Sequence, residues 1–232
     1  MDSAQGAVPR ATDELNQLKT RLLAMGGEAE EQVRAAVRAL VDGDLGLAER
    51  VLCGDEPIDR LHMEIDKRCY DLLVEHHPSA TDVRVVVSGV KINSDLERIG
   101  DVAVNIAEAT FSYLQHPPVK PLIDIPRMAE HAQGMLRDAL NAYVRHATDM
   151  AYDVLDRDDT LDGLKDQVFR ELLRYMVQNP ATTEPALDLI LISRHLERIG
   201  DHATNIAEEV IFMVSGRDVR HHAQEGRDPT EH

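Results

Sequence analysis

The sequence predicts an all-α protein built from two tandem, pseudo-symmetric three-helix bundles, with six long helices in total. The first indication is an internal repeat: residues 92–108 (INSDLERIGDVAVNIAE) and 192–208 (ISRHLERIGDHATNIAE) are identical at twelve of seventeen positions. A duplicated segment indicates a duplicated structural unit, so each half should fold alike. Apolar residues recur at helical spacing, and no segment shows sustained strand alternation. Aromatic residues make up only 3% of the chain, which is typical of helix bundles built from aliphatic side chains.

Helical periodicity and turn signals divide the first repeat, residues 1–116, into three helices. The expected helices cover about residues 13–41, 44–75 and 79–115. The Gly26–Gly27 pair is where a kink would fall in the first helix, and Pro57 marks a bend in the second. Pro78 ends the second helix, and Ser79 or Thr81 is expected to cap the third.

A Pro-rich segment, residues 117–125, separates this repeat from the second, residues 126–216, because consecutive prolines cannot continue a helix. Three further helices are expected over about residues 126–148, 149–178 and 184–215. Thr182 or Thr183 should cap the last one, and Gly216 should end it. The remaining segment, 217–232, is polar and is expected to be a disordered tail.

Composition narrows the possible functions. The formal net charge is −17, whereas nucleic-acid binding requires a basic surface, so we expect no nucleic-acid partner. An acidic surface suits cations or a basic patch on a partner protein. The two cysteines, Cys53 and Cys69, form neither a metal-type pair nor a disulfide framework. The N-terminus has no apolar leader and the apolar runs are too short to span a bilayer, so we expect a cytoplasmic protein that meets membranes only through partners.

Each copy of the repeated helix carries a narrow stripe of oxygen-bearing side chains, opposite its apolar face. The stripes consist of Glu97, Asp101, Asn105 and Glu108 in the first copy, and of Glu197, Asp201, Asn205 and Glu208 in the second. Like charges at i and i+4 destabilise a helix by about 0.2–0.5 kcal/mol. The chain accepts this cost twice, at matched positions, which favours a functional role for the acids.

The preceding helix of each repeat carries another acid pair at the same spacing: Asp55 and Asp59 in the first repeat, Asp158 and Asp162 in the second. If consecutive helices pack antiparallel, the stripes converge. Converging carboxylates require a hard cation, since they otherwise repel one another and their pKa values rise. The candidate metal ligands are therefore Glu97, Asp101, Glu197, Asp201, Asp55, Asp59, Asp158 and Asp162.

Two other interpretations remain open. The acids can instead form a solvated face screened by Arg98 and Arg198, which would make the protein a helical structural or interaction adaptor without bound metal. A carboxylate-bridged metal oxidase or hydrolase is less favoured, because no Glu-x-x-His pair accompanies the stripes. Gly100 and Gly200 lie in helix interiors, where glycine is unfavourable, and indicate either close helix approach or backbone access for a ligand. His202 is a structural residue or a further ligand.

The segments LERIGDVAVNIAE and LERIGDHATNIAE closely resemble the PhoU family, the regulators of bacterial phosphate uptake. The similarity covers about residues 12–215 and includes the upstream acid pairs and the RELLRYMVQNP stretch at 170–180. The resemblance implies two similar three-helix bundles, usually dimeric, with multinuclear metal binding at the E/D-x-x-x-D motifs. By position, the ligands would be Glu97, Asp101, Glu197 and Asp201, with the four upstream aspartates as companions.

The resemblance also implies a cytoplasmic, non-enzymatic homodimer. Such a protein would act beside the ATPase of the phosphate ABC importer and its sensor histidine kinase, and would suppress the phosphate-starvation response when phosphate is plentiful. The metal is left open among magnesium, manganese, iron, zinc and calcium. The repeats differ at Asp95/His195 and Val102/His202, which leaves open whether the two sites hold equal numbers of metal ions.

Overall fold

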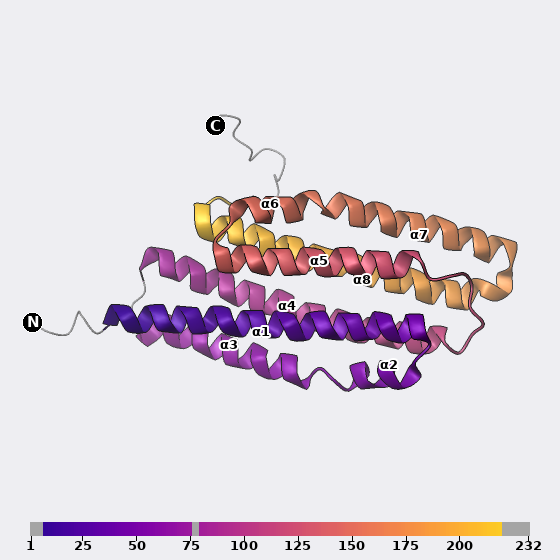
Figure 1. Cartoon of the computed structure of the whole chain (residues 1–232), viewed down its shortest axis with the longest axis horizontal. Coiled ribbons are helices and arrows are strands. Elements are labelled where there is room, and N and C mark those ends of the chain that lie inside the picture. The colour runs from indigo at the N-terminus through magenta and orange to yellow at the C-terminus, as the bar shows by residue number, and fades with distance from the viewer. Residues whose placement is uncertain (1–6, 76–78, 220–232) are drawn as a thin grey trace, which may run out of the picture.

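The computed structural model describes residues 7–75 and 79–219, and within them the chain is helical with no strand. Long helices run side by side along the longest axis of the molecule (Figure 1). The elements are α1 (Ala7–Asp42), α2 (Leu45–Leu52), α3 (Glu56–Glu75), α4 (Ala80–Tyr113), α5 (Asp124–Arg145), α6 (Thr148–Asp156), α7 (Asp158–Gln178), the 3-10 turn η1 (Pro180–Thr182) and α8 (Thr183–Ser215). The predicted all-α architecture of two three-helix bundles is confirmed.

Two of the six predicted helices are each interrupted, so that α2 and α3 replace one, and α6 and α7 replace the other. In the first repeat the break lies at residues 53–55, ahead of Pro57. Pro57 is in the first turn of α3, where its missing N–H would have had no helical partner. The proline therefore marks a helix start, and not the predicted bend. The break at Arg157 has no proline beside it, and the sequence carried no signal for it.

The predicted helix ends are largely confirmed. Ser79 caps α4 in a capping box with Asp82. Gly216 ends α8 in the left-handed conformation, with φ of +71°. Thr182 precedes α8 without a side-chain cap hydrogen bond. Helix α1 continues unbroken through Gly26–Gly27, so the predicted kink is absent. A Cβ at Gly26 would clash with Leu140 of α5, and this glycine therefore allows α1 and α5 to approach closely.

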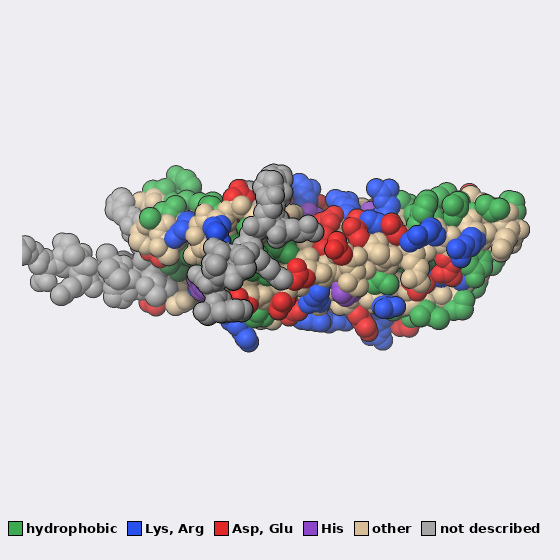
Figure 2. Space-filling view, turned by 90° about the horizontal axis from the view of Figure 1, so that it is seen from above, with side chains coloured by type: hydrophobic (Ala, Val, Ile, Leu, Met, Phe, Trp, Pro, Cys, Tyr) green, Lys and Arg blue, Asp and Glu red, His purple; other side chains and the backbone are tan. Residues whose placement is uncertain are grey.

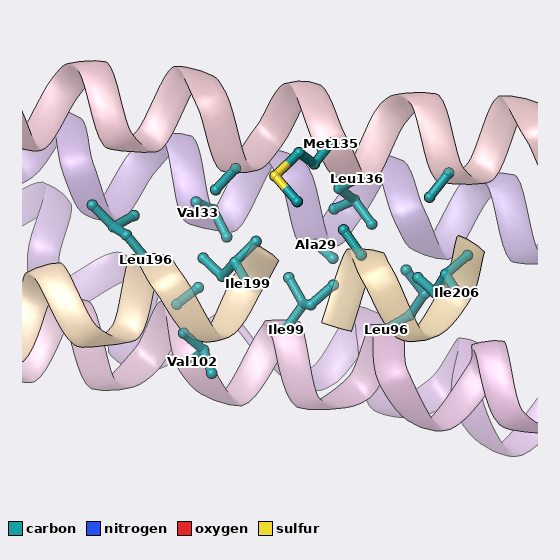
Figure 3. Packing of buried hydrophobic residues seen from close by; sticks show 14 of the residues in the cluster. Ala29, Val33, Leu96, Ile99, Val102, Met135, Leu136, Leu196, Ile199 and Ile206 are labelled. Carbon is teal, nitrogen blue, oxygen red and sulfur yellow. The ribbon is translucent and has the colours of Figure 1, made fainter. Parts of the chain in front are cut away.

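The two bundles share one hydrophobic core. Helices α4 and α8 lie against each other at the centre, α1 and α5 complete the central layer, and α3 and α7 flank it (Figure 1). Side chains from all four central helices interdigitate where the bundles meet, and those labelled in Figure 3 are completely buried. The Pro-rich segment is anchored by Lys120, whose ammonium lies 2.7 Å from Asp124 and 2.5 Å from Glu171. The repeats are thus continuous in their packing.

The tail predicted from residue 217 begins with an ordered contact, because Val219 is buried against this core. Residues 220–232 of that predicted disordered tail lie outside the described residues.

The sequence differences between the repeats reflect one polar contact across the α4–α8 interface. His202 Nδ1 lies 2.9 Å from Asp95 Oδ1, and Asn205 also donates to that oxygen at 3.2 Å. The repeat offset maps Asp95 onto His195 and His202 onto Val102, so the symmetry-related pair is His195 with Val102. Accordingly, Nδ1 of His195 is buried without a hydrogen-bond partner, and burial lowers the pKa of this imidazole. His202 is therefore paired with Asp95 across the interface, which supports its structural interpretation.

Candidate functional site

The eight predicted ligands fall into two groups, one in each repeat. The first cluster consists of Asp55 and Asp59, at the start of α3, with Glu97 and Asp101 of α4; the second consists of Asp158 and Asp162 of α7 with Glu197 and Asp201 of α8. Within each repeat the two helices pack against each other and run antiparallel, as predicted (Figure 1). Each cluster therefore draws carboxylates from two neighbouring helices.

Gly100 and Gly200 lie where these helices approach each other most closely. A Cβ on Gly100 would stand 2.9 Å from Ile58 Cδ1, and a Cβ on Gly200 would clash with Leu161. Ile58 and Leu161 directly precede Asp59 and Asp162, and each glycine directly precedes an acid of the repeated motif. The close-approach interpretation of the glycines is thus confirmed. In the second repeat the same contact brings the acids of the two helices near one another, since the charges of Asp158 and Asp162 act on Asp201.

The four acids of the second cluster interact electrostatically. Loss of hydration, followed by the charges of Glu197, Asp158 and Asp162, raises the pKa of Asp201 to about 6. The pKa of Asp158 is raised as well, first by burial and then by the charge of Asp162. These shifts are those expected of partly buried carboxylates held close together.

Lys165 of α7 joins this cluster, and sequence reasoning missed it. Its ammonium lies 2.7 Å from Asp162 Oδ1 and 2.8 Å from Glu197 Oε1, so it bridges the two helices. These two contacts raise the pKa of Lys165 above its ordinary value. The i, i+3 spacing from Asp162 was the one available signal.

The first cluster is more open. Asp55, Asp59 and Asp101 are exposed. Arg98, whose side chain is 60% exposed, lies 3.2 Å from Asp101 and 3.5 Å from Glu97. This pairing is the surface screening that the alternative interpretation anticipated, and exposed pairs of this kind contribute about 0–1 kcal/mol.

The chemistry of both clusters suits a hard cation. Carboxylate oxygens from facing helices are the ligands preferred by divalent ions such as magnesium, manganese and calcium. Burial, followed by the neighbouring carboxylates, keeps the pKa of Asp201 raised even though Lys165 lies in the same cluster. Within residues 7–75 and 79–219, no three His, Cys, Asp or Glu side chains stand close enough to hold one metal ion. Metal binding would therefore require side-chain rotation, and the ligand assignments remain predictions.

One member of the second stripe, Asn205, contacts a residue outside the acidic clusters. Asn205 donates a hydrogen bond to Asp95 across the bundle interface.

Among the described residues, no helix has both the length and the apolar character required to cross a lipid bilayer.

The fold and the site define a class of duplicated helical bundles with carboxylate pairs at matched positions, and comparison with known proteins assigns the family. The family model described as "PhoU domain" matches this chain twice, over residues 22–110 and 125–210. The chain belongs to the PhoU family.

Relatives and solved structures agree with this assignment. The Pseudomonas putida phosphate-specific transport system accessory protein PhoU homolog is 40% identical over 90% of this chain and 82% of its own length. The Aquifex aeolicus homolog is 38% identical over 90% of this chain and 94% of its own length. The crystal structure of PhoU from Pseudomonas aeruginosa superposes with a TM-score of 0.85 at 38% identity, covering 89% of this chain and 99% of that one.

The phosphate transport system regulatory protein PhoU from Streptococcus pneumoniae superposes with a TM-score of 0.83 at 28% identity, covering 90% of this chain and 99% of that chain. These relatives are named accessory or regulatory proteins and not enzymes, in agreement with the non-enzymatic function that the sequence predicts.

The raised pKa of Asp201 predicts a pH-dependent gain in stability for Asp201→Asn. The native state binds this proton more readily than the unfolded state, so the contribution of Asp201 to stability is complete below its ordinary pKa of 3.8 and is lost as the pH rises through about 6. With a chelator present, the variant should be more stable than the parent at about pH 8. Because Asp201 is exposed, we expect a gain of only about 1 kcal/mol. Urea unfolding of both proteins between about pH 4 and pH 8 measures the difference. A gain that is equal at both ends of this range would contradict the prediction.

Proposed function

We propose that this protein is a metal-binding cytoplasmic regulator of phosphate uptake and of phosphate-starvation signalling. Family membership supports this proposal, since the relatives are named as accessory and regulatory proteins of phosphate transport systems. The protein would act as a negative regulator, which restrains the starvation response when phosphate is plentiful. Its partners would be the ATPase of the phosphate ABC importer and the sensor histidine kinase, and contact with the membrane would run through them.

The acidic surface supports a role in protein contacts. A net charge of −17 suits a basic patch on a partner and speeds its association by electrostatic attraction. Figure 2 shows hydrophobic side chains toward both ends of the visible face, one of them the end where α7 leads into α8, with a region of mixed charge between them. The exposed hydrophobic residues of this α7–α8 end include Phe169, Leu173, Val177, Leu187 and Leu191. We propose that the protein forms a homodimer, as the family resemblance implies.

The proposed metal binding is carried by one observation: both helices of a close helix contact carry an acid pair beside that contact, and this placement occurs twice. A divalent or trivalent ion would replace carboxylate repulsion with coordination and would fix α3 on α4, and α7 on α8. The candidate ions are magnesium, manganese, iron, zinc and calcium. A bound ion supplies positive charge and an ordered geometry to the site, while the chain supplies the carboxylates and their spacing.

A second candidate function is that of a helical adaptor whose acids remain without metal. The ion pairs of Arg98 and Lys165 favour it, because these two side chains already neutralise part of each cluster. The two candidates make opposite predictions for the effect of metal on stability.

The metal proposal predicts that Glu97→Ala/Asp101→Ala loses stability relative to the parent only in the presence of metal. A ligand that binds the native state stabilises it by mass action, and the variant would lose that contribution in its first cluster. In chelator the variant should equal or slightly exceed the parent, because it lacks a like-charge pair and gains two alanines. Melting temperatures of both proteins, each with chelator and with added manganese, provide the measurement. Equal shifts under the two conditions would favour the adaptor without metal.

The regulatory proposal predicts that deletion of this protein leaves phosphate-starvation genes expressed at high phosphate. The physical reason is the loss of the contact that restrains the importer and the kinase. A reporter fused to a starvation promoter, read at high and at low phosphate, measures the effect, and a strain carrying the intact coding sequence on a plasmid is the control. Normal repression in the deletion strain, with no second copy of the family present, would count against the proposal.

A further inference from the structure

The second repeat carries a surface of exposed apolar and basic side chains, formed by a row along α7 and a row along α8. We call it the apolar–basic face; it consists of Phe169, Leu173 and Val177 with Arg170 and Arg174 of α7, and of Leu187, Leu191 and Arg194 of α8. Figure 2, seen from the α7 side, shows hydrophobic and basic side chains together toward the end where α7 leads into α8. None of the acids of the second cluster belongs to this face.

The two rows border the same contact between the helices. Lys165 of α7 lies 2.8 Å from Glu197 of α8, and this contact sets the register of the two antiparallel helices (Figure 1). The apolar row of α7 continues from Lys165 at intervals of four residues, so Leu173 lies level with the part of α8 eight residues before Glu197. Leu187 and Leu191 flank that level. Apolar side chains of both helices therefore lie beside one another.

The matching surface of the first repeat is polar and internally neutralised. Where the repeats are aligned, Lys67 and Asp71 correspond to Arg170 and Arg174. The ammonium of Lys67 lies 2.6 Å from the carboxylate of Asp71. In the second repeat a base occupies the position of the acid, which leaves two like charges at i and i+4, an arrangement that destabilises a helix.

Two further positions differ in the same sense. Asp66 corresponds to Phe169, and Ser94 corresponds to Arg194. The second repeat thus has an aromatic residue and a base where the first has an acid and a small hydroxyl side chain. Because the first repeat folds with polar residues at these positions, the fold itself does not require the apolar and basic ones. A contact with another molecule gives a reason for them.

The arginines of this face are not neutralised by the chain itself. Arg170, Arg174 and Arg194 form no ion pair with any residue that the structure describes. Their neighbour His195 responds to this charge: burial, followed by the charges of Arg198 and Arg194, lowers the pKa of its imidazole. Although the whole chain has a net charge of −17, this face offers positive charge to an acidic partner.

We propose that the apolar–basic face is a docking surface for an amphipathic helix of another protein, one with acidic side chains beside its apolar row. Two apolar rows on neighbouring helices pack well against a third helix whose apolar residues recur at i, i+3, i+4 and i+7. Acids that flank this row would pair with Arg170, Arg174 and Arg194. The face shares no residue with the proposed metal ligands, so the docking surface does not depend on bound metal.

Charge favours this occupant over two others. In a symmetric dimer through this face, the arginines of one copy would face those of the other and repel them. An anionic membrane would attract the arginines but repel the rest of a chain whose net charge is −17. An acidic helix brings negative charge only where the arginines lie.

The test is binding of a synthetic peptide to the full-length protein, measured by the fluorescence anisotropy of the labelled peptide. The peptide is an amphipathic helix of about 18 residues, or five turns, with leucines in one row and glutamates on both sides of it. The parent should bind it with a micromolar Kd, and rising salt should weaken binding. Arg170→Glu/Arg174→Glu should weaken binding by about tenfold or more, because like charges then face each other.

Two further variants make the result specific. Lys67→Glu/Arg127→Glu changes the net charge by the same amount on exposed residues outside the face, and should bind the peptide like the parent. Leu173→Ser/Leu187→Ser keeps every arginine but removes apolar contacts, and should also weaken binding by about tenfold or more. Both leucines are exposed, so this variant should retain the helical circular dichroism and melting temperature of the parent.

Three results would overturn the proposal. The first is absence of peptide binding by the parent, or equal binding by the parent and Arg170→Glu/Arg174→Glu. The second is conversion of a dimer to a monomer by Leu173→Ser/Leu187→Ser in sedimentation, which would assign the face to a second copy of this chain. The third is binding of the parent to phosphatidylglycerol vesicles but not to the peptide, which would assign the face to a membrane. None of these results bears on the proposed metal binding or on repression at high phosphate.

Discussion

The close contacts at Gly100 and Gly200 are the constraint on which the candidate site depends. Glycine is unfavourable inside a helix by about 1 kcal/mol relative to alanine, yet each of these glycines lies where two helices of its repeat pack closely together. Because these glycines have no Cβ, Ile58 of α3 packs directly against α4 at Gly100, and Leu161 of α7 packs directly against α8 at Gly200. At Gly200 the same contact places Asp158 and Asp162 near Asp201, so tight packing and carboxylate crowding occur together there. The repulsion between the acids is offset by burial of the apolar side chains beneath them, and a cation would remove it.

The same packing explains how two similar repeats came to differ locally. Helices α4 and α8 run antiparallel where they meet. A residue of α4 therefore contacts a residue of α8 that is not its own counterpart in the repeat. Asp95 pairs with His202 on one side of the pseudo-symmetry axis, while the related positions hold His195 and Val102. Likewise, Lys165 occupies the position of the second repeat that corresponds to His62 of the first. The duplication preserved the carboxylates and the glycines but allowed their charged neighbours to diverge, and this divergence gives the repeats different electrostatic properties.

Much of this structure could be predicted from residue patterns. The duplicated LERIGD segments predicted two like units, and the capping serine at Ser79 and the terminal Gly216 marked helix ends correctly, because these signals are local. The breaks at 53–55 and at Arg157 could not be placed, since tertiary packing decides them and only one has a proline nearby. The facing arrangement of the acid pairs was predictable from antiparallel helices. The contacts of Lys165 and the Asp95–His202 pair were not, because they depend on side chains from helices distant in sequence.

The account predicts that a cation belongs between the facing acid pairs, and anomalous scattering from a manganese-soaked crystal tests this most directly. A manganese peak should lie between α3 and α4, within coordinating distance of Glu97 and Asp101, and a second peak should lie between α7 and α8. Peaks only at other surface carboxylates, or no peak at saturating manganese, would contradict the account and leave the clusters as a solvated, ion-paired face.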